Sequence, residues 1–93
     1  MIYKILSVSE ALSDTPSTVS GANRVLIQHN ANAGSSHLIT LKSDAGAEGG
    51  VAIVGTFWIH PGQDIVIEKY KLYTLEVGEN ITDVRATYIG VTG

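Results

Sequence analysis

Apolar and polar residues alternate along most of this chain, and clusters of Gly, Pro, Asn, Asp and Ser interrupt the alternation roughly every 8–15 residues. Successive side chains of a β-strand point to opposite faces, so the pattern predicts strands with one apolar face. No stretch carries the period of a helix. The expected strands are residues 2–8, 24–30, 37–43, 51–59, 64–69, 69–77 and 84–91. The sequence therefore predicts an all-β fold, a single small antiparallel β-sandwich or barrel of six to seven strands, as one domain over residues 1–93.

The alternation also assigns faces to the strands. Val25 and Ile27 share one face with His29, Ile39 shares one with Leu41, and Ile65 and Ile67 are expected to point inward from the segment DIVIEK. The segment HPGQ reads as a turn, because Pro and Gly favour the backbone angles of a tight turn. SDAGAEGG, residues 43–50, reads as a flexible loop.

The segment VAIVGTFWI, residues 51–59, is apolar on both of its predicted faces. One face is expected to hold Val51, Ile53, Phe57 and Ile59, and the other Ala52, Val54 and Trp58. A strand of this kind is normally buried on both sides. A domain of this size has too few further residues to cover the second face. We therefore expect another subunit to cover it.

Length and charge exclude several classes of function. A chain of 93 residues buries roughly 60–65% of its unfolded surface, enough for one thin core. The net charge is −3, and the six Lys and Arg residues are scattered, which disfavours nucleic-acid binding. The absence of cysteine excludes disulfides and thiol nucleophiles. No apolar run reaches the length of a signal peptide core or a membrane span, so we expect synthesis in the cytoplasm and no membrane partner.

Catalytic and metal-binding motifs are incomplete. HPGQDIVIE resembles the metal-ligand segment of small cupin barrels, with His60 and Glu68 as candidate ligands. The pattern lacks a second histidine beside His60, and His29 and His37 lie on or next to other strands. No G-x-S-x-G motif marks a nucleophilic serine, and the glycine-rich loop is not followed by the helix of a phosphate site. We therefore predict no catalytic residue, metal or cofactor, and keep a cupin-like metal-binding protein as the least favoured alternative.

Aromatic residues offer a different kind of site. Trp58 and Tyr88 fall within strands and are expected in the core or an interface, whereas Tyr70 and Tyr73 are expected to be exposed. Exposed aromatic rings can stack on sugars, but Tyr and Trp are also favoured at the centres of protein interfaces. We predict a partner interface that includes Val54, Trp58, Tyr70 and Tyr73.

The order of segments resembles that of small virion proteins of tailed bacteriophages. The resemblance is carried by RVLIQHN, LITLKS, VGTFWIHPGQDIVIEK, YTLEV and the final VRATYIGV, and it covers roughly residues 20–91. It implies a non-enzymatic structural protein of the virion, made in the host cytoplasm: a capsid decoration or cement protein, or a tail-associated protein. The implied partners are the major capsid protein or tail proteins. The resemblance also implies a homo-oligomer, which for a decoration protein is a trimer. The alternative is a carbohydrate- or receptor-binding module of a tail or fibre.

Overall fold

A computed structural model describes residues 2–32, 34–44, 50–78 and 82–92 of the chain. Most of the predicted glycine-rich loop, residues 45–49, lies outside the described residues, as do residues 79–81 before the last strand. The described residues are all-β, as predicted, and they include no helix long and apolar enough to cross a lipid bilayer.

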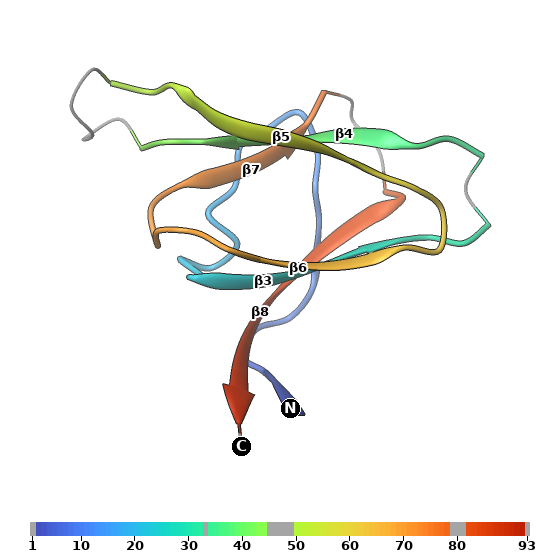
Figure 1. The fold of residues 1–93 in the computed structure, drawn as a ribbon, viewed down its shortest axis with the longest axis horizontal. Helices are drawn as coiled ribbons and strands as arrows, with labels where there is room; N and C mark the ends of the chain where they lie inside the picture. Colours follow the sequence, from blue (N-terminus) through green and yellow to red (C-terminus); the bar gives the residue numbers. More distant parts are fainter. Residues whose placement is uncertain (1, 33, 45–49, 79–81, 93) are drawn as a thin grey trace.

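The described residues contain eight strands, which form two antiparallel sheets (Figure 1). They are β1 (Ile2–Ile5), β2 (Glu10–Ala11), β3 (Arg24–His29), β4 (His37–Lys42), β5 (Ile53–Ile59), β6 (Asp64–Glu68), β7 (Thr74–Val77) and β8 (Val84–Thr92). One more strand is present than the six to seven expected, because the two-residue β2 is too short to show a period. The two sheets are not closed into a barrel, so of the two predicted architectures the protein adopts the β-sandwich.

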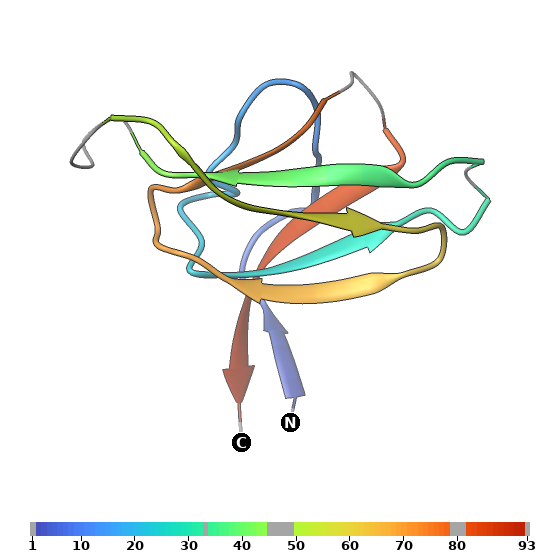
Figure 2. The ribbon, with the colours of Figure 1, turned by 45° about the horizontal axis from the view of Figure 1, so that its top comes forward.

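The two sheets are joined at one side by the chain between β2 and β3. The first sheet has the order β1–β8–β3–β6, with β2 also pairing along β8, and the second has the order β5–β4–β7. Ser17 and Leu75 exchange two backbone hydrogen bonds of 3.0 and 2.8 Å, and the Val77 amide donates to the Ser13 carbonyl at 2.9 Å. Residues 13–17 therefore cover the outer edge of β7. On the opposite side, β5 leads through the predicted HPGQ turn into β6, in the other sheet (Figure 2).

The core lies between the sheets and follows the predicted alternation in β3, β4 and β6. Val25, Ile27 and Ile39 are fully buried, and Ile65 and Ile67 pack against them from β6. The remaining members of the cluster are Leu12, Val19, Ala22, Ile59, Leu75, Val77, Val84 and Ala86. Apolar burial of about 25 cal/mol per Å² makes this cluster the main source of stability.

The faces predicted for residues 51–59 are wrong in their first half. Phe57 and Ile59 do turn toward the core, but Ile53 is 65% exposed and Val51, which precedes β5, is exposed as well. The β4–β5 register shifts between Leu41, which pairs with Gly55, and Lys42, which pairs with Ile53. The alternation of inward and outward side chains from Gly55 to Ile59 therefore does not continue back to Ile53.

Two strands extend together beyond the sandwich. β1 pairs with residues 89–92 of β8, and this terminal ribbon leads away from the two sheets (Figures 1 and 2). The predicted first strand, residues 2–8, ends at Ile5, after which Leu6 and Ser7 bond individually to the backbone of Tyr88. Ile2, Tyr3 and Ile5 are exposed. The ribbon therefore carries apolar side chains that the described part of the protein does not cover.

Candidate functional site

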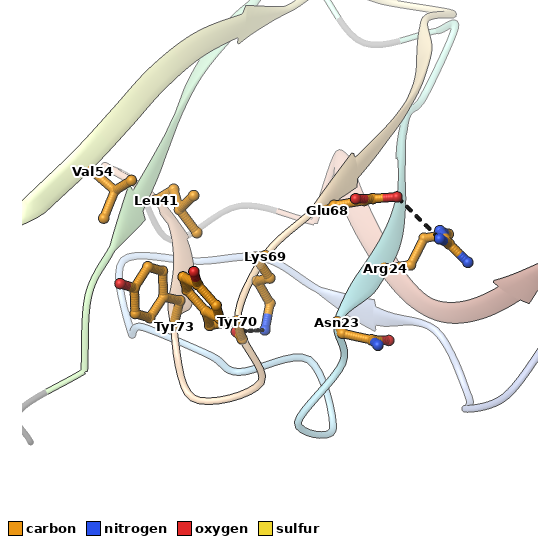
Figure 3. A pocket seen from close by; sticks show the side chains of 8 residues that line it. All are labelled: Asn23, Arg24, Leu41, Val54, Glu68, Lys69, Tyr70 and Tyr73. Carbon is orange, nitrogen blue, oxygen red and sulfur yellow. Dashed lines mark hydrogen bonds and ion pairs between the residues drawn. The ribbon is translucent and has the colours of Figure 1, made fainter. Parts of the chain in front are cut away.

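A hollow of about 480 Å³ opens beside the turn that joins β6 to β7 (Figure 3). Both sheets contribute to its wall. It is lined by Asn23, Arg24, Leu41, Val54, Glu68, Lys69, Tyr70 and Tyr73, and we call it the tyrosine hollow. Arg24 and Glu68 are direct partners in the β3–β6 ladder, and their side chains form an ion pair of 3.0 Å on its wall. Its lining thus combines aromatic rings, aliphatic groups and both signs of charge.

Lys69 forms the buried floor of this hollow. It continues the inward alternation of Ile65 and Ile67, and its side chain is only 8% exposed. Its ammonium donates to the carbonyl oxygens of Ala22 at 2.6 Å, Tyr70 at 3.3 Å and Lys71 at 3.4 Å. Burial lowers the pKa of Lys69 from 10.5 to about 8, so the side chain is still mainly protonated at neutral pH. Lys69 therefore ties the β6–β7 turn to the segment before β3.

The segment before β3 has an unusual backbone that presents the Ala22 carbonyl to Lys69. Val19, Ser20 and Gly21 all have positive φ, at 53°, 58° and 70°. A β-branched residue such as valine rarely adopts this conformation. The turn is held by side-chain acceptors, since the Val19 amide donates to Ser17 Oγ at 3.0 Å and the Gly21 amide to a threonine hydroxyl at 3.2 Å. Strain of this kind persists only where the surroundings over-determine it.

A pair of tyrosines forms one wall of the hollow: Tyr70 is exposed as expected, whereas Tyr73 is half-buried. Tyr70 and Tyr73 close a turn in which the Tyr73 amide donates to the Tyr70 carbonyl at 3.1 Å. Their rings meet edge to face, with centroids 5.0 Å apart, and Tyr70 is 73% exposed. A second hollow of about 590 Å³ lies against the same turn and adds Asp44, Lys71 and Leu72 to the lining. The turn therefore presents an aromatic surface beside two concave regions, an arrangement that can take a planar ring or an apolar side chain.

The structure brings three of the four predicted interface residues together. Val54, Tyr70 and Tyr73 line the tyrosine hollow, although Val54 lies in β5 and the two tyrosines lie in the turn between β6 and β7. Trp58 lies elsewhere on β5, opposite Leu38 of β4, and is 58% exposed. Lys69 was not among the predicted interface residues, and sequence reasoning missed that its side chain is buried beneath the tyrosines. The alternation of Ile65, Ile67 and Lys69 was a signal that could have placed its side chain inward.

The histidines gather in a pair rather than in a metal-binding group. The rings of His29 and His37 stack inside the sandwich, with centroids 5.3 Å apart. His60 instead makes a 2.6 Å hydrogen bond with Ser36, and Glu68 pairs with Arg24, so the two candidate cupin-like ligands do not converge. Among the described residues, no three His, Asp or Glu side chains are close enough to hold a metal ion together.

The buried histidine pair has polar neighbours of its own. His29 Nε2 lies 2.7 Å from the Ser35 carbonyl oxygen, and Nδ1 lies 3.1 Å from that of Asn30. His37 Nε2 lies 3.6 Å from a carboxylate oxygen of Asp83. These contacts connect the ends of β3 and β4 with the residue before β8, so the pair has a structural role in the sandwich.

Comparison of the chain with protein-family models, with curated proteins and with solved structures found no match.

Proposed function

We propose that this protein is a non-enzymatic structural component of a bacteriophage virion, most specifically a capsid decoration or cement protein. The observation that supports an assembly role is that twelve large apolar side chains of the described residues are exposed, as many as the described hydrophobic residues that are buried. They are Ile2, Tyr3, Ile5, Leu6, Val8, Leu38, Val51, Ile53, Val54, Trp58, Tyr70 and Leu72. Extended exposed apolar surface marks interaction sites.

The proposed contacts lie on two parts of the surface. The tyrosine hollow offers Tyr70 and Tyr73 as aromatic anchors, with Val54 at its wall, and the outward face of β5 offers Trp58. Burial of such aromatic anchors commonly dominates the energy of an interface. A protein that binds the assembled particle and not its separate subunits stabilises the assembly by mass action. The partner is the major capsid protein or a tail protein, bound by a homo-oligomer at repeated sites.

Mass spectrometry of purified phage particles tests this proposal. We expect the protein in intact particles at a copy number that matches a repeated site of the capsid or tail. Binding is then measured by sedimenting emptied particles with added recombinant protein. Tyr70→Ala should lower the bound fraction at least tenfold, whereas Asp64→Ala, an exposed residue of β6 that lines neither hollow, should lower it much less. Absence of the protein from particles, together with no binding to them, would overturn the proposal.

A carbohydrate- or receptor-binding module of a tail or fibre is the second candidate. The observation that favours it is the exposed Tyr70 ring beside a hollow that also holds Asn23, Arg24 and Glu68, because aromatic rings with polar neighbours can bind sugars. A glycan array should then show binding that is lost in Tyr70→Ala and Tyr73→Ala. The matched control is Tyr3→Ala, which removes an exposed tyrosine from the terminal ribbon. Binding to no glycan, or equal loss in the control, would exclude this candidate.

A further inference from the structure

β5 is an edge strand without the features that usually protect an edge. In the described part of the protein, β5 pairs with β4 on one side only. Its seven residues, IVGTFWI, contain no charged residue and no proline. Natural edge strands are usually short, charged, bulged or covered, because an open edge can pair with a further strand. The register shift protects only the beginning of β5, near Ile53.

The backbone groups at the centre of β5 face the open side. Their direction can be worked out from β7. The Leu75 amide donates to the Ser17 carbonyl, so the backbone groups of Leu75 point away from β4. Along a strand, the N–H and C=O groups of successive residues point to alternate sides. In an antiparallel ladder, the N–H and C=O groups of two paired residues either both point toward the other strand, forming a hydrogen-bonded pair, or both point away from it. Carried through the β7–β4 and β4–β5 registers, this rule directs Phe57 toward β4, and Thr56 and Trp58 toward the open side.

We propose that β5 pairs antiparallel with β5 of a second copy of the chain, about a two-fold axis at Thr56. Thr56 then lies opposite the partner's Thr56, and the two residues exchange a reciprocal pair of backbone hydrogen bonds through the groups that face the open side. Val54 lies opposite the partner's Trp58, and Gly55 lies opposite the partner's Phe57. The two three-stranded sheets join into one continuous sheet of six strands.

The sequence of β5 is self-complementary in this register. A side chain built at Gly55 would meet nothing within 4 Å, so there is room beside it for the partner's Phe57 ring. Aromatic residues opposite an edge glycine, and threonine opposite threonine, are favourable cross-strand pairs. Because β5 contains no charge, the pairing opposes no like charges. The two-fold axis reproduces each contact on its other side, as an isologous dimer requires.

The size of the contact predicts a dimer that dissociates on dilution. The exposed apolar surface of Ile53, Val54, Trp58 and the neighbouring Leu38 and Val51 amounts to roughly 500 Å² per copy, below the ~800 Å² per partner of a standard interface. The joined sheet does not grow further through its outer strands, because residues 13–17 cover the far edge of β7. The contact therefore closes at two copies.

Sedimentation and light scattering over a range of protein concentrations test the dimer. The measured mass should rise from that of one chain to that of two with increasing concentration. Thr56→Lys places two ammonium groups opposite each other at the axis and should keep the protein monomeric at concentrations where the native protein is dimeric. Thr40→Lys is the matched control, because Thr40 is the β4 partner of Thr56, on a strand already paired on both sides. It should leave the dimer intact.

A crosslinking variant keeps the test informative if the lysine disturbs folding. The chain contains no cysteine, so Thr56→Cys adds a single thiol whose nearest counterpart in the dimer is the same residue of the second copy. Hydrogen-bonded pairs have Cα atoms about 5.5 Å apart, within the range that a disulfide spans. Oxidation should give a covalent dimer with Thr56→Cys and not with Thr40→Cys. A monomer at every concentration, a trimer, or equal crosslinking of both variants would overturn this inference.

The dimer and the virion role can fail separately. A dimer that binds no phage particle would remove the proposed function and leave the β5 contact standing. A protein that binds particles but is monomeric in solution would remove the β5 contact and leave the proposed function standing.

Discussion

Lys69 is the residue on which the shape of the tyrosine hollow depends. It is the only buried lysine or arginine of the described residues, and its ammonium connects the Ala22 carbonyl to two carbonyls of the β6–β7 turn. Lys69→Met keeps the aliphatic stem but removes the donor, which leaves the Ala22 carbonyl without this bond. We expect the free energy of unfolding at pH 7 to fall by about 1–3 kcal/mol in urea titrations. Lys71→Met, two residues along and exposed, should change it by less than about 0.5 kcal/mol.

The lowered pKa of Lys69 gives stability a predictable dependence on pH. The pKa is about 8 in the folded protein and 10.5 in the unfolded chain, so between these values the unfolded chain binds more protons. The contribution of Lys69 to the free energy of unfolding must then rise with pH between about 8 and 10.5, and it is constant at lower pH. The difference between the native protein and Lys69→Met, which cancels the shared tyrosine titrations, should rise from pH 8 toward pH 10. A difference that falls over this range would mean that the three carbonyls outweigh burial.

Single residues were the hardest features to predict from the sequence. Tyr70 and Tyr73 were identified because exposed aromatics next to lysines are conspicuous, and their turn is local. Trp58 was grouped with them by residue type, yet it lies on another part of the surface, opposite Leu38. The positive φ of Val19 and Ser20 has no sequence signal, since it is imposed by the hydrogen bonds around Ser17 and the burial of Val19. Residue type indicates chemistry, but the fold decides which residues meet.

At the scale of the element, alternation predicted β3, β4 and β6 well because each has one face on the core. It was wrong for the first half of β5, where a shift in register changes which residues share a face. A shift of this kind depends on the neighbouring strand, β4, so the sequence of β5 alone could not reveal it. Alternation also did not predict β2, whose two residues pair with β8.

The faces of β4 provide a direct test of this alternation. Ile39 is fully buried between the sheets, whereas Leu38, one residue earlier, points outward and is partly exposed. Ile39→Ala should lower the free energy of unfolding by about 2–5 kcal/mol, because it removes buried methyl groups and leaves a cavity. Leu38→Ala should cost less than about 1 kcal/mol. Similar losses for the two variants in urea titrations would show that the outward face of β4 is covered as well.

At the scale of the whole molecule, the sandwich and the terminal ribbon differ in what supports them. The sandwich has a shared core, and the sequence predicted it because alternation recurs in strand after strand. The ribbon was predicted only as a first strand, since nothing in residues 2–8 shows that β1 would pair with the end of β8 on the side of the sandwich away from the second sheet. Its Ile2, Tyr3 and Ile5 are exposed, and the fully buried Ile89 lies at its base, so strand pairing is the main support of the rest of the ribbon.

This difference predicts where the protein opens first. An isolated two-stranded ribbon is only marginally stable in water, so its hydrogen bonds should break in local openings that leave the sandwich folded. In hydrogen exchange followed by mass spectrometry on dilute protein, peptides covering residues 2–6 and 89–92 should exchange well before a peptide covering β3, whose residues pair with both β6 and β8. Adding assembled particles should slow exchange in the ribbon if it contacts them. Equal protection of ribbon and β3 in the dilute protein would show that a further surface already covers the ribbon, because two paired strands cannot supply that protection alone.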